Sequence, residues 1–171
     1  KMEVKTNYIL TDVVPDVDFF SRYMNQMEWK NMNEQYGNYK EYADSLPDER
    51  PVEQYVKHIT DYDMPLKKFL IKTFRHWGIK TQDFRCEFFL TKPGGNLPAH
   101  VDHKSKIALL FPLAENTGVL KVDSCPDIVY NKMLILNTQA EHQVCSPEKD
   151  RLLFRIAVHD FLFENLSYEQ S

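Results

Sequence analysis

A succession of eight short apolar segments in the second half of the chain constrains the fold more than any other feature of the sequence. Each segment is four to eight residues long, and turns such as KPGGN at 92–96 and CSPEKD at 145–150 separate neighbouring segments. The segments are Phe84–Thr91, Leu97–Val101, Lys106–Leu113, Gly118–Asp123, Asp127–Tyr130, Met133–Asn137, Glu141–Cys145 and Arg151–Val158. Strands of this length and spacing are typical of two antiparallel sheets packed face to face. The pattern therefore predicts a mainly β fold, a double-stranded β-helix or jelly roll, over about residues 84–161.

The first part of the chain, about residues 1–80, has the periodicity of helices instead. Asp16 can accept a hydrogen bond from the first turn of a helix, because apolar residues recur at helical spacing directly after it. A second helix is predicted to end at Gly78. Its apolar stripe consists of Leu66, Phe69, Leu70, Thr73, Phe74 and Trp77. We therefore expect a single domain over residues 1–171, with the N-terminal helices packed on one sheet of the jelly roll.

A polar, tyrosine-rich segment, Trp29–Tyr42, falls between the two helical regions. Its composition is typical of a solvated loop with a helical turn, although loops of this length also serve as lids over sites. Both interpretations are open, and the sequence does not say what a lid would recognise.

Composition and cysteine usage exclude several classes of protein. The formal net charge is −4, so the chain lacks the basic surplus of general nucleic-acid binders. Cys86, Cys125 and Cys145 are odd in number and widely spaced, which argues against a disulfide framework or a zinc ribbon and favours small core residues in a reducing compartment. Without a signal-peptide pattern or an apolar run near 18 residues, we expect a cytoplasmic protein with no membrane partner.

The last predicted strand, Arg151–Val158, shows which side chains face the interior. Successive residues of a strand point to opposite faces. One face is entirely apolar and is expected to pack against the helices: Leu152, Phe154, Ile156 and Val158. The opposite face directs Arg151 and Arg155 into the barrel. Because a buried, unpaired guanidinium is very unfavourable, this face predicts a bound anion such as a small-molecule carboxylate.

Arg85 and Glu87 alternate with apolar residues on the first predicted strand. Either set can line the interior, and the sequence alone does not decide which.

His100 and Asp102 are two residues apart, so on a strand their side chains share a face and can bind one metal ion. A third ligand must come from elsewhere, and His142 lies on a later predicted strand. Two histidines and one carboxylate form the facial triad of non-haem Fe(II) oxygenases, which leaves positions open for co-substrate and O₂. Zinc more often favours a closed tetrahedral set or three histidines. His103 is expected to lie in the turn after the strand rather than to bind.

The stretch AHVD…HQVCSPEKDRLLFRIAV resembles the Fe(II)/2-oxoglutarate-dependent dioxygenase superfamily, whose pattern is His-x-Asp, a distal His and then an Arg. Within that superfamily it is most similar to the aspartyl/asparaginyl β-hydroxylase and proline hydroxylase branch, in the motifs KPGGNLPAHVD, IALLFPL and HQVCSPEKDRLLF. The resemblance covers roughly residues 84–161. The N-terminal half carries no diagnostic motif.

This resemblance implies that His100, Asp102 and His142 bind Fe(II) and that Arg151 pairs with the distal carboxylate of 2-oxoglutarate. A planar guanidinium can hold a carboxylate through two parallel hydrogen bonds, which fixes its position and orientation. The implied activity is hydroxylation of an unactivated C–H bond of an amino acid, a peptidyl residue or another compact substrate. O₂ would be consumed, and succinate and CO₂ would be the co-products.

The sequence departs from that branch on the strand after His-x-Asp. The branch tends to carry an Arg-x-His there, whereas this chain has Ala108 and Leu110 at the matching positions. A second hydrogen-bonding partner for 2-oxoglutarate is therefore absent or comes from elsewhere. Arg155 is one candidate, since it shares the face of Arg151, and a contact with substrate or within the barrel is the alternative role.

The remaining histidines have structural interpretations. His58 and His76 fall in segments with a helical pattern, and His159 follows the last strand, where packing is expected.

Two other functions compete with the oxygenase. One is a cupin-like metalloenzyme that uses zinc, manganese or nickel without 2-oxoglutarate, although His103 departs from the His-x-His spacing of cupins. The other is a non-catalytic jelly roll that binds an acidic metabolite or a peptide. Neither the substrate nor the oligomeric state is readable from the sequence.

Overall fold

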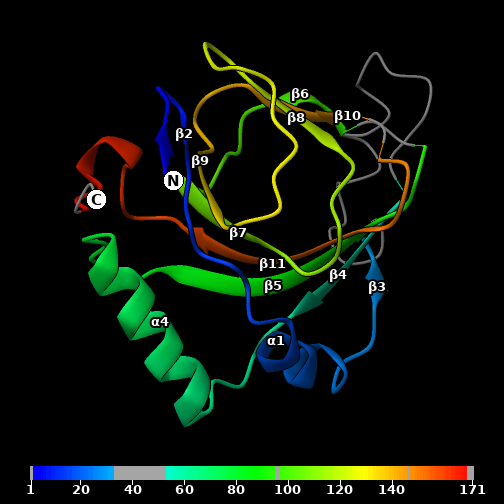
Figure 1. Cartoon of the computed structure of the whole chain (residues 1–171). Coiled ribbons are helices and arrows are strands. Elements are labelled where there is room, and N and C mark those ends of the chain that lie inside the picture. The colour runs from blue at the N-terminus through cyan, green and yellow to red at the C-terminus, as the bar shows by residue number, and fades with distance from the viewer. Residues whose placement is uncertain (1, 33–52, 95–96, 146, 169–171) are drawn as a thin grey trace.

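Two antiparallel sheets form the body of the molecule (Figure 1). The computed structural model describes residues 2–32, 53–94, 97–145 and 147–168. The larger sheet has the strand order β1-β2-β9-β7-β11-β5-β4-β3, and the smaller sheet has the order β6-β10-β8. The strands are β1 (Glu3–Val4), β2 (Tyr8–Leu10), β3 (Lys30–Asn31), β4 (Gln54–His58), β5 (Phe84–Thr91), β6 (Leu97–His100), β7 (Ile107–Pro112), β8 (Val119–Val122), β9 (Leu134–Asn137), β10 (His142–Cys145) and β11 (Arg151–Val158). The predicted jelly roll is therefore confirmed.

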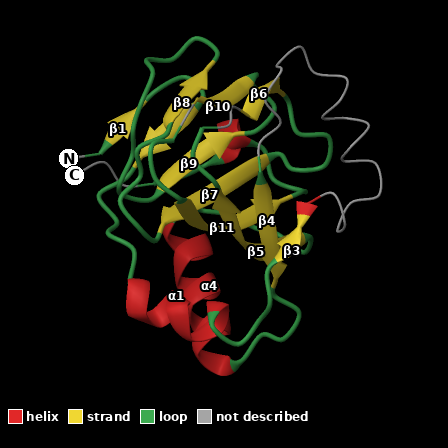
Figure 2. Ribbon diagram, turned by 90° about the vertical axis from the view of Figure 1, so that its right-hand side faces the viewer, coloured by secondary structure: helices red, strands yellow, loops and turns green. Residues whose placement is uncertain are grey.

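The helices lie on one face of the larger sheet, away from the smaller sheet (Figure 2). They are α1 (Val17–Met24) and α4 (Met64–His76), and a 3-10 turn, η1 (Phe163–Asn165), follows the last strand. As predicted, the Asp16 side chain accepts from the backbone N–H of Phe19 at 3.1 Å and caps α1. Gly78 follows the C-terminus of α4 with a φ of +65°, and a Cβ there would lie 2.8 Å from that of Ser167. Only glycine fits this turn without strain.

The prediction of a helical N-terminal part was wrong where β1, β2, β3 and β4 lie, because all four strands belong to the larger sheet. The two longest of them, β2 and β4, pair with β9 and β5. His58 consequently lies at the end of β4 and not in a helix. Both strands are short, three and five residues, which is too little for a period of two to stand out in the sequence.

The predicted strand at Asp127–Tyr130 is also wrong. Ile128 forms an isolated bridge with Leu120, through backbone hydrogen bonds of 2.8 and 3.0 Å. The chain does not continue as a ladder because the carbonyl of Tyr130 accepts from the Asn116 side chain at 3.1 Å instead of from a neighbouring strand. The seven other predicted segments each contain a strand.

The core on the helix side of the larger sheet is rich in aromatic residues. Phe20 of α1 stacks on Phe154 of β11 with 4.5 Å between ring centroids, and Phe69 of α4 packs edge-on against Phe111 of β7. Ile156 and Val158 of β11 belong to the same cluster. The apolar face predicted for β11 therefore does pack against the helices.

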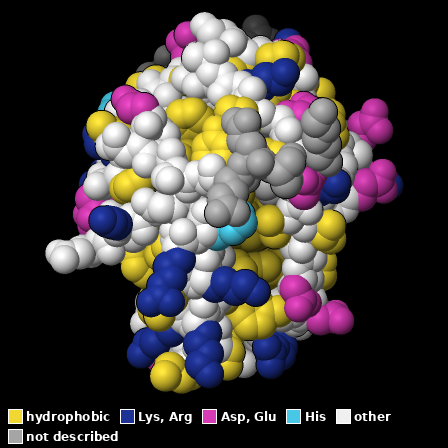
Figure 3. Space-filling model, turned by 60° about the vertical axis from the view of Figure 1, so that its left-hand side comes forward, with side chains coloured by type: hydrophobic (Ala, Val, Ile, Leu, Met, Phe, Trp, Pro, Cys, Tyr) yellow, Lys and Arg dark blue, Asp and Glu magenta, His cyan; other side chains and the backbone are white. Residues whose placement is uncertain are grey.

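The solvent-facing side of α4 is basic. Figure 3 shows Lys and Arg side chains gathered on the lower part of this face of the molecule, and α4 contributes exposed Lys67, Lys68, Lys72 and Arg75. No helix of the described residues combines the length and the apolar character that crossing a membrane requires.

The three cysteines are free thiols. Cys86 is fully buried in the core, as expected, whereas Cys125 and Cys145 are partly exposed. Cys125 packs against the core cluster on the interior side of the sheet, and its Sγ atom accepts from the backbone N–H of Asn7 at 3.3 Å.

Candidate metal centre

His100, Asp102 and His142 are brought together by the smaller sheet. His100 is the last residue of β6, His142 is the first residue of β10, and the two are direct partners in the antiparallel register. Asp102 follows β6, and its backbone N–H donates to the carbonyl of Thr138 at 3.0 Å, which holds it beside the turn that leads into β10. Cross-strand pairing therefore accounts for a site whose members are far apart in sequence.

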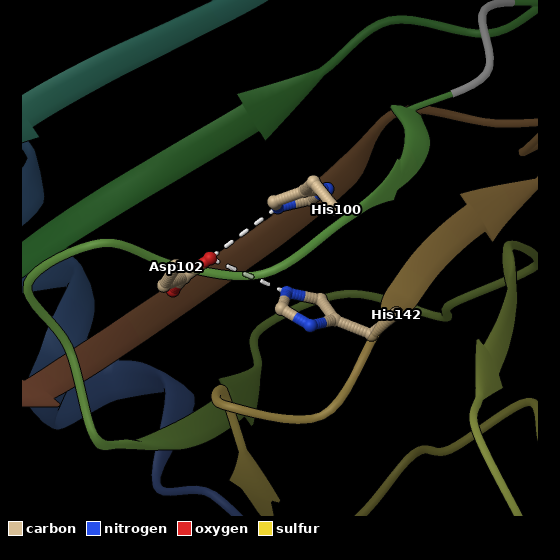
Figure 4. Close-up of side chains that lie close together, drawn as sticks. All are labelled: His100, Asp102 and His142. Carbon is tan, nitrogen blue, oxygen red and sulfur yellow. Dashed lines mark ion pairs between the residues drawn. The ribbon is translucent and has the colours of Figure 1, made fainter.

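The three side chains point toward one another (Figure 4). The Nε2 atoms of His100 and His142 lie 3.3 and 3.4 Å from the same oxygen, Oδ1 of Asp102. One ligand atom from each residue lies within 4.8 Å of the other two. Two imidazole nitrogens and one carboxylate oxygen in this arrangement could hold a transition-metal ion.

A backbone contact orients His142. Its Nδ1 lies 2.8 Å from the carbonyl oxygen of Ala140, so Nδ1 carries the proton and donates it there. Nε2 is then the ring nitrogen that faces Asp102, where it can donate to the carboxylate or, in the neutral ring, offer its lone pair to a metal. This is the usual way in which a neighbouring carbonyl fixes the tautomer of a ligating histidine.

Asp102 is held in its ionised form. Burial would raise the pKa of its carboxyl, but hydrogen bonds from His100 and His142 and the charge of Arg155 outweigh burial and hold that pKa well below the usual value. Its second oxygen, Oδ2, accepts from Nη2 of Arg155 at 3.0 Å. The carboxylate thus has one oxygen bonded to an arginine and the other directed at the two imidazoles.

Arg151 lies in the interior, as predicted, and is only 6% exposed. Its Nη2 donates to the hydroxyl of Tyr130 at 2.8 Å, while its Nε is buried without a hydrogen-bond partner in the described part of the chain. Thr91 lies directly opposite on β5, and its buried hydroxyl also has no partner there. A buried cation with one neutral partner is strongly unfavourable, so this end of the interior can accommodate an anion.

Arg155 also faces the interior, but it has protein partners. It bonds Asp102 as described, Nη2 lies 3.3 Å from the hydroxyl of buried Ser105, and Nε lies 3.8 Å from Oε1 of Glu87. The two inward arginines therefore differ: carboxylates of the chain surround Arg155, whereas no described carboxylate forms an ion pair with Arg151.

One pocket joins these groups. It spans about 490 Å³ of space between atoms, part of which is open solvent. The metal-ligand candidates, both arginines, Gln54 and Thr138 supply its polar lining, and apolar side chains supply the rest: Phe89, Ala108, Leu110, Leu120, Leu136, Val144 and Leu153. Ala108 and Leu110 thus lie inside the pocket, where their apolar side chains offer no hydrogen bond to a ligand.

The other predicted residues lie away from this pocket. His103 is exposed in the turn after β6 and is outside the three-residue group. The ring of His76 packs against Trp77 with 5.0 Å between centroids, and Nδ1 of His159 lies 3.2 Å from Asp83. Most of the Trp29–Tyr42 segment, from residue 33 onward, lies outside the described residues.

Sequence reasoning did not identify Glu87, Thr91 and Tyr130 as residues of this region. Glu87 is completely buried, and the register pairs it with Arg155, so β5 directs Arg85 and Glu87 to the interior face. Alternation along β5 allowed either face, and only the pairing of β5 with β11 decides between them. Tyr130 is the last residue of the segment Asp127–Tyr130, which was wrongly expected to be a strand, so its inward direction was not predicted.

Comparison with known proteins shows the fold. No protein-family profile matches the sequence, and no curated protein matches it. Among solved structures, a prolyl-4-hydroxylase from Pseudomonas putida is 15% identical over 90% of this chain and 93% of that chain, with a TM-score of 0.56. A viral collagen prolyl hydroxylase from Paramecium Bursaria Chlorella virus-1, in complex with 2-oxoglutarate, is 13% identical over 90% and 96%, with a TM-score of 0.56. At these identities the likeness shows a shared fold.

Proposed function

We propose that the protein is an Fe(II)- and 2-oxoglutarate-dependent oxygenase that hydroxylates an unactivated C–H bond of a small or side-chain substrate. The observation that carries this proposal is the pairing, within one pocket, of a two-histidine, one-carboxylate group with a buried arginine that no described carboxylate neutralises. Two prolyl hydroxylases with the same fold, one of them a complex with 2-oxoglutarate, support it.

His100, Asp102 and His142 are the residues that would hold the iron. Their donor atoms suit Fe(II), and three protein ligands leave room for further ligands, whereas a structural zinc site is usually closed by four. The bound iron would supply O₂ activation coupled to oxidative decarboxylation of 2-oxoglutarate to succinate and CO₂. The hydrogen bond from Nδ1 of His142 to Ala140 and the ionised state of Asp102 prepare both side chains for this role.

Arg151 is proposed to bind the distal carboxylate of 2-oxoglutarate. The hydroxyl of Tyr130 accepts from its Nη2 and orients the guanidinium, which leaves the unpartnered Nε free to donate to the ligand. Arg151 would thus act without the second basic partner, which Ala108 and Leu110 do not provide.

The apolar wall of the pocket excludes water from the reacting groups. Leu110, Leu120 and Leu153 lie in the lining and are at most 5% exposed. An apolar lining that holds little water strengthens the electrostatic contacts of a bound diacid and protects a reactive centre from side reactions. The substrate class proposed, an amino acid or a peptidyl residue, is suggested by the names of the two prolyl hydroxylases.

The test is the binding of 2-oxoglutarate to the full chain and to Arg151→Met. We expect the substitution to weaken 2-oxoglutarate affinity about 100-fold, as for loss of a charge-assisted pair, and to leave metal affinity within about twofold. Arg75→Met, an exposed arginine on α4, is the matched control and should bind like the unchanged protein. If Arg151→Met binds 2-oxoglutarate as tightly as the unchanged protein does, Arg155 and not Arg151 would be the residue that binds the carboxylate.

Turnover is tested by mass spectrometry of pools of amino acids and peptides. A substrate should gain one oxygen only when 2-oxoglutarate is present, with one succinate formed per oxygen added. If metal binds but no 2-oxoglutarate binding and no succinate are detected, the cupin-like metalloenzyme becomes the better account.

A further inference from the structure

A row of charged side chains crosses the larger sheet and ends at Asp102. His58 on β4 is the register partner of Glu87 on β5, and Glu87 is the register partner of Arg155 on β11. Register partners of an antiparallel sheet share a face, so all three side chains lie on the interior side. The row leads from the partly exposed His58 to the candidate metal centre.

Glu87 is the anionic centre of this row and is fully buried. Its Oε2 lies 3.0 Å from Nδ1 of His58, and its Oε1 lies 3.2 Å from Nε of Arg85 and 3.8 Å from Nε of Arg155. A fully buried carboxylate is rare without cationic partners of this kind. Glu87 and Asp102 are thus the two carboxylates whose charges balance that of Arg155.

Arg155 connects Glu87 to Asp102. Its Nη2 donates to Oδ2 of Asp102 at 3.0 Å, while both imidazole Nε2 atoms approach Oδ1. Its guanidinium also lies over the ring of Phe89 at 5.4 Å, and Ser105 is within hydrogen-bond distance. Arginine is suited to this task because its planar donors have a fixed geometry.

We propose that Glu87 and Arg155 are positioning residues that make Asp102 a one-oxygen metal ligand. With Oδ2 bonded to Arg155, only Oδ1 can turn toward the ion, so the carboxylate cannot take a second coordination position. The proposed function, on which this inference rests, needs that position for co-substrate or O₂. Glu87 acts on Asp102 only through Arg155, whose charge it helps to balance across the 3.8 Å between Oε1 and Nε.

The experiment is an anaerobic titration with Co(II) alone, followed by visible absorption, on the full chain and its variants. Glu87→Gln should weaken Co(II) affinity about tenfold, because partners of metal ligands typically contribute 10–100-fold. Arg155→Met should shift the Co(II) absorption bands, because both oxygens of Asp102 then become available to the ion. The matched control is Asp83→Asn, which removes a carboxylate that pairs with His159 and with no member of this row, and it should change neither readout.

A double variant separates positioning from a direct effect of charge. If Glu87 acts through Arg155, adding Glu87→Gln to Arg155→Met should cause less than about a twofold further loss of Co(II) affinity. A tenfold loss in both backgrounds would overturn the proposal, and so would unchanged Co(II) binding by Glu87→Gln.

Removal of a buried charge can prevent folding, so Glu87→Asp provides a second test. It keeps the negative charge but withdraws it from Arg155, and Co(II) affinity should fall about threefold or more, whereas unchanged affinity and spectrum would contradict the inference. Because 2-oxoglutarate is not added, these outcomes are independent of co-substrate binding. Failure of the unaltered protein to bind Co(II) would overturn the proposed metal centre as well.

Discussion

The two faces of β11 differ in whether the chain itself supplies partners for their side chains. On the helix side, Phe154, Ile156 and Val158 are fully buried against side chains of the same chain. On the interior side, Arg151 and Arg155 are held in a pocket, and one of them has no anionic partner among the described residues. The outer face is satisfied within the protein, whereas the inner face has one buried guanidinium without a described anion, which the proposed function pairs with a ligand. Such a departure from a well-satisfied core is expected at a functional site.

The largest effect should follow from damage to the outer face. Phe154→Ala removes a ring that is 0% exposed and stacks on Phe20, and we expect the free energy of unfolding to fall by about 3–5 kcal/mol. Urea unfolding of the full chain measures this. Leu162→Ala, at a site 42% exposed, is the control and should change it by less than about 0.5 kcal/mol. A loss below about 1 kcal/mol in Phe154→Ala would mean that this face is not the stabilising one.

A substitution on the interior face of β11 should not lower the free energy of unfolding of the ligand-free protein. Arg151→Met replaces a poorly paired buried charge with an apolar side chain, so the ligand-free protein should be as stable as before or more stable by about 1 kcal/mol. In the metal-loaded protein, 2-oxoglutarate at 100 times its dissociation constant should raise the stability by about 2.7 kcal/mol, and at the same concentration this gain should fall to about 0.4 kcal/mol in the variant. Urea unfolding with and without 2-oxoglutarate gives both quantities.

Either of two results would remove the contrast between the faces. A loss above about 2 kcal/mol in ligand-free Arg151→Met would show that the arginine has a structural role. Undiminished stabilisation by 2-oxoglutarate would show that the ligand does not contact it.

The smallest effect concerns the start of the helix that covers the outer face. The Asp63 side chain accepts from the backbone N–H of Leu66 at 3.0 Å and caps α4. Asp63→Ala should lower the free energy of unfolding by about 1 kcal/mol, the usual effect of losing a cap. Asp61→Ala, an exposed acid two residues earlier, should have almost no effect. Equal effects of the two substitutions in thermal unfolding would exclude the cap as the cause.

The sequence predicted those features that are local in the chain. Alternation in Arg151–Val158 predicted the correct inward and outward faces of β11. Asp16 and Gly78 correctly marked the start of α1 and the end of α4. It also gave the correct three residues, His100, Asp102 and His142, as a group that meets in space. Their role as iron ligands remains a prediction.

Features that depend on pairing between distant strands could not be predicted in this way. β4 joins the sheet only through β5 and β3, and the five residues of β4 carry no clear period on their own. The partners of Glu87 depend on the register of three strands, and a shift of one residue would have turned the side chain to the other face. For the same reason the sequence left open whether Arg155 contacts the co-substrate, the substrate or a group within the barrel, and only the strand pairing shows its contact with Asp102.

The anaerobic visible spectrum of the protein with Fe(II) and 2-oxoglutarate is the decisive measurement. A 2-oxoglutarate molecule that chelates iron held by His100, Asp102 and His142 should give a weak charge-transfer band in the unaltered protein. The band should disappear in Asp102→Ala and persist in His103→Ala, since His103 is exposed and outside the group. Absence of the band in the unaltered protein, or an equal band in Asp102→Ala, would contradict the assignment of these three residues as the iron site.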